Sequence, residues 1–362
     1  MNEAVVTNKR SYRIAIIPGD GIGKEIVPEG LKVLKAISNL DDFKLNLQSF
    51  PWGAEYYLET GEFMPANALD ILCQFDAIYF GAVGHPKVDD SLPAIHFTFR
   101  IRKAFLQYVN LRPVRLLPGL ESPLKGKKPQ AIDFVIVREN TEGEFAEIGG
   151  LFKPDQQEGF ATQTGIFTRL GIERVARYSF ELARHRRGKL TNVTKSNALT
   201  YGLLYWDRII EEVRLEFPDV EYEKLYVDAV AMHFVLNPDR FDVLLCTNLF
   251  GDILSDLGVA LLGSLGMGPS GNINPEMRYP SMFEPIHGSA PDIAGLGIAN
   301  PIGAIWSGAL MLEHLGEKQA AQKIISSISA VLCEGPQPKD LGGNASTTEI
   351  GDAIVEHMLS AS

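Results

Sequence analysis

Two aspartates, Asp252 and Asp256, are the residues whose type and spacing point most directly to chemistry. They are four residues apart in an apolar helical pattern that follows a short strand, with Asn248 placed as its N-cap, so they share one helix face. Two carboxylates on one face repel each other unless a cation lies between them, and Mg²⁺ and Mn²⁺ take oxygen ligands. An isolated pair of this kind more often lies on a solvated surface. Gly251 and Leu257 frame a helix that is too apolar to be simply a surface element, which lowers the odds of a solvated pair and favours a divalent metal site.

Arginines form a second group of candidates, because planar guanidinium groups bind carboxylates through two hydrogen bonds. Arg138 follows a strand of the buried type, and the others lie near the turn at 110–113: Arg100, Arg102, Arg112 and Arg115. Several arginines near one pocket predict a dicarboxylate ligand. Surface ion pairing, the usual role of an arginine, suits Arg100 and Arg115 best.

The segment GDGIG at 19–23 follows a predicted strand and opens a predicted helix. A dinucleotide fingerprint requires G-x-G-x-x-G and an acidic residue about twenty positions later at the end of a second strand. This sequence meets neither requirement. Taken alone, the segment therefore predicts only a tight turn between strand and helix.

The Gly- and Pro-rich loop at 284–292 precedes an apolar helix and is suited to wrapping a nucleotide with backbone amides and a carboxylate. A carboxylate beside a ribose accepts hydrogen bonds from both hydroxyls and repels a 2′-phosphate. His287 alone is more often a structural loop residue than a ligand contact.

The elements that position these residues alternate between short apolar strands and longer helices, which predicts an α/β fold with a mostly parallel sheet. The clearest helix is expected at 24–37, and strands are expected at 12–17, 77–80, 132–137, 190–194, 224–228 and 243–246. The segment 148–169 departs from this strand–helix alternation and is expected to be a protruding hairpin. The polar clusters follow strand ends, where open α/β sheets bind their ligands, so we expect an enzyme.

Composition narrows the class of protein. The 362 residues are 45% hydrophobic, enough for two domains. A net charge of −11 without a concentrated basic run argues against a nucleic-acid partner. No segment is long and apolar enough to span a membrane, which argues against a membrane partner. The three cysteines are far apart in apolar contexts, which predicts buried thiols in a reducing compartment. We expect a cytoplasmic protein.

Six motifs in order resemble the β-decarboxylating dehydrogenases, the family of isocitrate, isopropylmalate, homoisocitrate and tartrate/D-malate dehydrogenases. They are IPGDGIG at 17–23, NLRP at 110–113, RENTEG at 138–143, VDA at 227–229, GDILSD at 251–256 and the stretch 284–300. The resemblance runs from Ile14 to about Ile354 and is greatest for the tartrate/D-malate branch. It implies an isopropylmalate dehydrogenase-like two-domain α/β fold with a largely parallel sheet, distinct from the usual Rossmann fold.

By this resemblance, 1–107 with 263–362 would form the larger, cofactor-binding domain. The segment 108–262 would form a smaller substrate and dimerisation domain, with an arm at about 148–169 that clasps a partner. The resemblance implies a homodimer with shared active sites.

The resemblance also assigns site residues. Substrate-binding residues would be Arg102, Arg112, Arg138 and Thr98, and metal ligands Asp228, Asp252 and Asp256. The catalytic pair Lys195 and Asp228 would come from the other subunit, with Lys195 as the base. Hydride would leave C2 of a malate-like 2-hydroxy acid, and the β-keto acid would lose carbon dioxide as Mg²⁺ or Mn²⁺ stabilises the enolate.

The cofactor implied by the resemblance is NAD, because NADP enzymes of the family place Lys-Tyr where this chain has Asp292-Ile293. Asn197 would lie near the nicotinamide. The adenosine end would be lined by Glu284, His287, Gly288, Ala290, Asp292 and Asn300. A requirement for K⁺ stays open.

One position departs from the family. The usual proton donor is a tyrosine seven residues after the Arg138 equivalent, and this chain has Phe145. Either water or another group donates the proton, or decarboxylation is incomplete, or the substrate differs.

The substrate is left open among related acids. Residues Ile95, His96, Thr98 and Phe99 follow no branch closely, and the polar Thr98 argues against an isopropyl group. The alternatives are a 3-isopropylmalate or homoisocitrate dehydrogenase, and a specialised relative acting on an unusual malate. Two alternatives belong to other functional classes. One is a non-catalytic regulatory subunit, which would lose metal or base residues that this chain retains. The other is a pure nucleotide-binding module.

Overall fold

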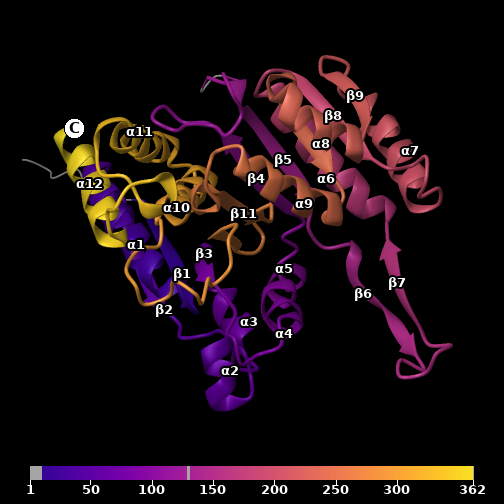
Figure 1. The fold of residues 1–362 in the computed structure, drawn as a ribbon, viewed down its shortest axis with the longest axis horizontal. Coiled ribbons are helices and arrows are strands. Elements are labelled where there is room, and N and C mark those ends of the chain that lie inside the picture. Colours follow the sequence, from indigo (N-terminus) through magenta and orange to yellow (C-terminus); the bar gives the residue numbers. More distant parts are fainter. Residues whose placement is uncertain (1–9, 129–130, 362) are drawn as a thin grey trace, which may run out of the picture. The chain divides into compact units, whose positions relative to one another are not determined.

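The structure is a computed structural model that describes residues 10–128 and 131–361. Two compact units divide the chain: unit 1 takes the described residues up to Thr98 and from Tyr279 onward, and unit 2 is Phe99–Arg278 (Figure 1). The boundaries predicted from the sequence lay instead at 107/108 and 262/263. The second boundary moves because β11 (Pro269–Ile273) pairs with β4 (Val109–Arg115), which attaches the segment before Tyr279 to unit 2; the first lies where helix α5 (Phe99–Ala104) begins.

In unit 1, the described strands form parallel pairs in the order β2-β1-β3-β12. Their bounds are Ser11–Gly19 for β1, Lys44–Ser49 for β2, Ala77–Ala82 for β3 and Ser281–Pro285 for β12. Consecutive residues of β1 and β3 are buried, as expected for parallel strands covered on both faces.

The helices of unit 1 pack around these strands. They are α1 (Gly23–Leu40), α2 (Ala54–Thr60), α3 (Ala68–Leu72), α4 (Ser91–Pro93), the π-helix Ala94–Thr98, α10 (Ile302–His314), α11 (Lys318–Glu334), the 3-10 helix Lys339–Leu341 and α12 (Thr347–Ser360). Helix α10 is buried from Ile302 to Leu312 because its sequence is apolar on all sides.

In unit 2, the strands follow the order β11-β4-β5-β10-β8-β9. Strand β4 runs antiparallel to both its neighbours, and the remaining pairs are parallel. The other bounds are β5 (Asp133–Glu139), β8 (Lys189–Thr194), β9 (Glu221–Tyr226) and β10 (Val243–Cys246).

The helices of unit 2 are α5 (Phe99–Ala104), α6 (Arg169–Arg184), α7 (Gly202–Arg214), α8 (Val227–Leu236), α9 (Asn248–Ala260) and the 3-10 helices Pro238–Arg240 and Leu265–Met267. The strand predicted at 224–228 extends past the observed end of β9 at Tyr226. Helix α8 begins at Val227 and buries Val230 and Phe234 at helical spacing, so Asp228 lies in its first turn.

A separate antiparallel hairpin, β6 (Gly143–Phe152) with β7 (Phe160–Ile166), extends from unit 2 (Figure 1). Its large apolar side chains are exposed in the single chain: Ile148, Leu151, Phe152 and Phe160. The hairpin begins five residues before the arm predicted at 148–169, and Thr168 already caps helix α6. Its role in clasping a partner stays a prediction.

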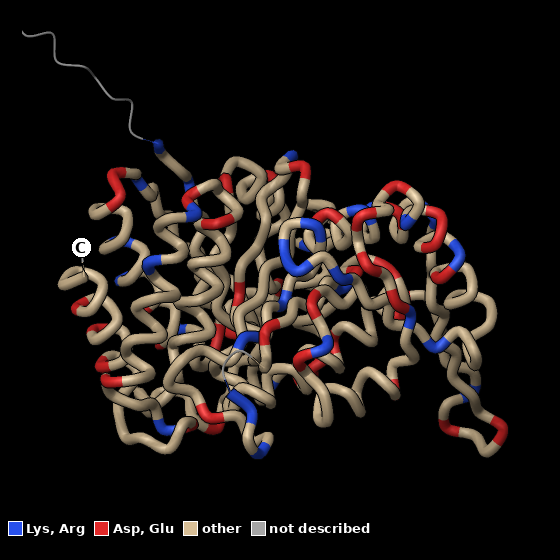
Figure 2. The backbone as a smooth tube through the Cα atoms, turned by 90° about the horizontal axis from the view of Figure 1, so that it is seen from above, with Lys and Arg blue, Asp and Glu red and all other residues tan. Residues whose placement is uncertain are grey.

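The predicted α/β organisation with a largely parallel sheet is confirmed. The prediction of buried thiols is right for Cys246 and wrong for Cys73 and Cys333, which are exposed. Basic and acidic residues are interspersed along the backbone (Figure 2). Among the helices of the described residues, none is long and apolar enough to span a membrane.

Candidate active site

Two buried arginines leave neighbouring strands of unit 2 on the same face. Arg112 on β4 lies opposite Ile136 on β5, and Ile136 is two residues before Arg138. Because side chains alternate along a strand, Arg112 and Arg138 point to the same side of the sheet. Arg102, on α5, is buried as well. The predicted surface arginines Arg100 and Arg115 are indeed exposed.

Helix α9 brings Asp252 to this pair. Its Oδ1 accepts a hydrogen bond from Nη1 of Arg138 and a second, at 3.3 Å, from Nη1 of Arg112. One turn later, Asp256 Oδ1 lies 4.0 Å from Nη1 of Arg112. The prediction that the two aspartates share one helix face is therefore confirmed, and the structure adds that this face lies against Arg112 and Arg138.

Two further residues of α9 position the arginines and were not predicted from the sequence. Asn248 Oδ1 accepts from Nε of Arg138 at 2.9 Å, and Ser255 Oγ accepts from Nη1 of Arg112 at 2.5 Å. The prediction that Asn248 caps the helix is wrong, because Thr247 is the N-cap and the Asn248 amide is occupied by Arg138 and the Glu142 carbonyl. The sequence did contain a signal for this grouping, because residues 248, 252 and 255 follow the i, i+4, i+7 spacing of a single helix face.

Gly251 allows α9 to approach β5 this closely. A Cβ atom at this position would lie 2.5 Å from Cβ of Arg138. The glycine of the GDILSD motif is therefore required by the contact between α9 and the arginine strand, and a side chain there would displace Asp252.

The charges in this cluster shift the pKa values of their neighbours. Burial and the guanidinium group of Arg112 lower the pKa of Arg138 to about 9, which leaves it a cation at neutral pH. Burial opposes ionisation of Asp252, but the guanidinium groups of Arg138, Arg112 and Arg102 outweigh it and lower the carboxyl pKa. Burial, with the charge of Asp252, raises the pKa of Asp256 against the opposite effect of Arg112.

The α9 carboxylates suit a hard divalent cation in part. Both side chains retain exposed surface, and a cation between them would offset the charge of Asp252, which together with burial raises the pKa of Asp256. Among the described residues of one chain, however, no group of three or more Asp, Glu, His or Cys lies close enough together to hold a metal. One chain thus supplies two carboxylates of the expected set, and Asp228 is not with them.

Asp228 instead forms a pair with Lys195. The Lys195 Nζ lies 2.7 Å from Asp228 Oδ1 and 5.7 Å from the ring centre of Tyr226. The ammonium group lowers the pKa of the Asp228 carboxyl. The predicted base and the predicted third metal ligand are therefore brought together within unit 2.

The predicted adenosine-binding residues lie in unit 1, mostly in the segment 286–300, which we term the cofactor loop. Burial lowers the pKa of His287, so its ring is neutral at pH 7, and its buried Nε2 has no hydrogen-bond partner among the described residues. Ala290 adopts the left-handed region with φ +42°, a strained conformation common at binding sites. An unpaired imidazole nitrogen and an exposed Asp292 carboxylate fit an adenosine group.

The remaining predicted residues have these positions. Glu284 is buried at the end of β12, Gly288 is exposed and Asn300 donates to Asp340 Oδ2 at 3.1 Å, all in unit 1. Asn197, in unit 2, is exposed. Thr98 is buried in the π-helix of unit 1, and its hydroxyl donates to the Ala94 carbonyl at 3.1 Å.

Phe145 lies beside the arginine cluster. Its ring centre is 5.5 Å from the Arg138 guanidinium carbon, and it packs edge-on against Phe99 with ring centres 5.5 Å apart. Phe99 in turn lies 5.8 Å from the guanidinium carbon of Arg102. This position therefore presents a hydrocarbon face to the cations and has no proton to donate.

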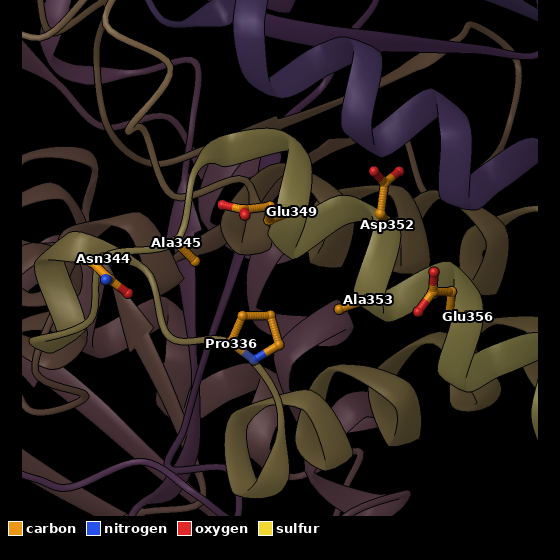
Figure 3. A pocket seen from close by; sticks show the side chains of 7 residues that line it. All are labelled: Pro336, Asn344, Ala345, Glu349, Asp352, Ala353 and Glu356. Atoms are coloured by element: carbon orange, nitrogen blue, oxygen red, sulfur yellow. The ribbon is translucent and has the colours of Figure 1, made fainter.

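A pocket on α12 is lined by carboxylates (Figure 3). Glu349 accepts from Ser346 in the capping box of α12, and Asp352 pairs with Lys32. Two of its three carboxylates, Glu349 and Asp352, thus already have structural partners, which makes this pocket a weaker candidate for the active site than the arginine cluster.

The chain is similar to known proteins over nearly its whole length. A family model described as isocitrate/isopropylmalate dehydrogenase matches residues 13–354. D-malate dehydrogenase [decarboxylating] of Escherichia coli is 48% identical over 97% of this chain and 99% of its own length. Tartrate dehydrogenase/decarboxylase of Pseudomonas putida is 47% identical over 96% and 98%. The structure of isocitrate dehydrogenase from Methylococcus capsulatus superposes with a TM-score of 0.86 at 37% identity, covering 96% of this chain and 99% of that one.

Substitution of Asp252 by Asn tests the electrostatic coupling. The folded-state pKa of Asp252 lies below its unfolded value, so its contribution to stability is present above about pH 4 and is lost as pH falls further. At pH 7 we expect Asp252→Asn to lower the free energy of unfolding by about 1 kcal/mol, a value discounted for the exposure of the side chain, and to abolish Mn²⁺ binding. Urea denaturation and Mn²⁺ titration measure these effects.

The control is Asp239→Asn, which removes an exposed carboxylate 3.6 Å from Lys127. It should change neither property measurably. An Asp252→Asn variant that binds Mn²⁺ as the wild type does would exclude Asp252 as a metal ligand.

Proposed function

Because the chain belongs to the isocitrate/isopropylmalate dehydrogenase family, we propose that it oxidises D-malate or tartrate with NAD and a divalent metal, and decarboxylates the β-keto acid formed. The observation that carries this proposal is the buried arginine cluster joined to two aspartates on α9. Guanidinium groups bind the carboxylates of a small dicarboxylic acid, and the aspartates bind the metal beside it. The similarity to D-malate and tartrate dehydrogenases supports the choice of acid.

Each residue has a defined task in this proposal. Arg102, Arg112 and Arg138 hold the two carboxylates, and Thr98 contributes to recognition of the third carbon. Lys195 accepts the hydroxyl proton while hydride passes from C2 to NAD. Mg²⁺ or Mn²⁺, held by Asp252 and Asp256 with Asp228 of a second copy, would supply Lewis-acid stabilisation of negative charge.

NAD is the proposed cofactor because the cofactor loop has an acidic residue at the discriminating position. The exposed carboxylate of Asp292 would accept hydrogen bonds from the ribose hydroxyls and repel the 2′-phosphate of NADP. The neutral ring of His287, whose Nε2 is unpaired within the described part of the chain, suits contact with the adenosine end. Glu284, Gly288, Ala290 and Asn300 are also assigned to the adenosine end, and Asn197 is assigned to the nicotinamide.

A homodimer with shared active sites explains two observations on the single chain. Exposed apolar side chains gather on α8 and α9 and on the hairpin: Met232, Val235, Leu236 and Ile253, with Leu151 and Phe152. Exposed apolar surface of this kind is typical of subunit interfaces. The separation of Asp228 from the other two metal ligands is also removed if each site takes Lys195 and Asp228 from a second copy.

NADH formation with Mn²⁺ or Mg²⁺ tests the proposal against D-malate, L- and meso-tartrate, 3-isopropylmalate, isocitrate and homoisocitrate, with carbon dioxide measured in parallel. We expect D-malate or a tartrate to give the highest kcat/KM, because the chain is similar to enzymes named for these acids and the polar Thr98 argues against an isopropyl group. A preference for 3-isopropylmalate or homoisocitrate would move the chain to those branches. NAD binding without turnover of any acid would favour a non-catalytic regulatory subunit or a specialised enzyme that acts on an unusual malate.

Phe145→Tyr tests the protonation step. Loss of carbon dioxide leaves a carbanionic carbon that must take a proton, and Phe145 has none to give. Restoring a hydroxyl should raise the rate of coupled carbon dioxide and keto-acid release by about a hundredfold or more if protonation limits turnover. Phe145→Leu, which also lacks a hydroxyl, is the control. Equal rates for wild type and Phe145→Tyr would show that water or another group already donates the proton.

Mixing two inactive variants tests the shared site. Lys195→Met and Asp252→Asn homodimers should each lack activity, whereas their hybrid would contain one site with both residues intact. Random reassortment makes half the dimers hybrids, so about a quarter of wild-type activity should return. Native mass spectrometry confirms that hybrids have formed. Hybrids without activity would place Lys195 and Asp252 in the same subunit's site.

A further inference from the structure

The Gly-rich turn at 19–23 contacts the cofactor loop through its backbone, all within unit 1. The amide of Ile22 donates to the Ser289 carbonyl at 2.9 Å. Gly21 has φ +53°, and a Cβ atom there would lie 2.1 Å from the Ser289 oxygen. The turn therefore holds one end of the loop, and a side chain at Gly21 would push the loop away.

Glu25, in the first turn of α1, holds the middle of the loop. Its two carboxylate oxygens accept hydrogen bonds from the amides of Gly295 at 2.6 Å and Gly297 at 2.9 Å. These bonds join residues 270 and 272 positions apart in the chain. A carboxylate that accepts from two backbone amides makes two charge-assisted hydrogen bonds and fixes both amides relative to the helix.

Helix α12 holds the far end of the loop. The amide of Thr347 donates to the Gly297 carbonyl at 2.9 Å, and its hydroxyl donates to the Ala299 carbonyl at 2.7 Å. The segment between Ser289 and Gly295 contains the strained Ala290 and the exposed Asp292. A strained backbone persists only where its flanks are fixed, and these contacts fix them.

We propose that Glu25 is a positioning residue that orders the cofactor loop for the adenosine end of NAD, and that the motif from Gly19 to Glu25 anchors this loop instead of binding phosphate. The inference rests on the proposed function, because it takes NAD as the ligand of the loop. A loop ordered in advance binds its ligand without the entropy cost of ordering it. Loss of the anchor should therefore weaken cofactor binding and leave the chemistry in unit 2 unchanged.

The test compares Glu25→Gln with Glu55→Gln. The introduced side-chain amide would present a donor to one of the two backbone amides, whereas Glu55 makes an exposed ion pair with Lys24 near the same turn. For Glu25→Gln we expect the Kd for NADH and the KM for NAD to rise about tenfold, the effect of losing a hydrogen bond to a charged group. The kcat and the KM for the hydroxy acid should stay within about twofold. Amide hydrogen exchange across 286–300 should be faster, and Glu55→Gln should match the wild type in every measurement.

Glu25→Asp is a second variant that still tests the anchor if Glu25→Gln does not fold. Its shorter carboxylate retains the charge and reaches one amide, so its Kd and exchange rates should fall between those of wild type and Glu25→Gln. Wild-type NADH affinity and loop exchange in both variants would overturn the anchor role and leave the proposed function intact. A wild-type protein that binds no NADH would overturn the proposed function, and this inference with it.

Discussion

The burial of two guanidinium groups on neighbouring strands is the constraint on which the site depends. Arg112 and Arg138 cannot be removed from water unless anionic and polar partners replace their hydration. Helix α9 supplies these partners from one face, through Asp252, Asn248 and Ser255. Asn248 in the first turn of α9 and Gly251 against Arg138 both serve this contact.

The same pairing prepares the site for an anion. The guanidinium groups of Arg102, Arg112 and Arg138 all lower the carboxyl pKa of Asp252, so their positive charges act on one place. A divalent cation on the α9 carboxylates would add positive charge there, and a dicarboxylate would offset it. Asp252 contacts both buried arginines and still has exposed surface, so the proposed metal-binding role does not conflict with its ion pairs.

Local features of the fold and site were predictable from the sequence, whereas long-range contacts were not. Helical spacing placed Asp252 and Asp256 on one face, and strand–helix alternation gave the α/β class, because both follow from periods of 3.6 and 2 residues. The bond from Arg112 to Ser255 spans 143 positions, and the pairing of β11 with β4 moved the unit boundary. Such contacts depend on strand order and register, which periodicity does not contain. Asp228 was misplaced at a strand end for a simpler reason, since its apolar neighbours suit strand and helix alike.

The Gly-rich motif predicted only a tight turn between strand and helix, and the structure adds a long-range contact of that turn with the cofactor loop. In a phosphate-binding turn, free backbone amides at the start of the helix meet the anion. Here the amide of Ile22 is occupied by the Ser289 carbonyl, and the first turn carries the Glu25 carboxylate, which would repel phosphate. Both groups instead act on the cofactor loop, more than 260 residues away in the chain. Glycine is still required, because the loop backbone approaches the turn as closely as a phosphate would.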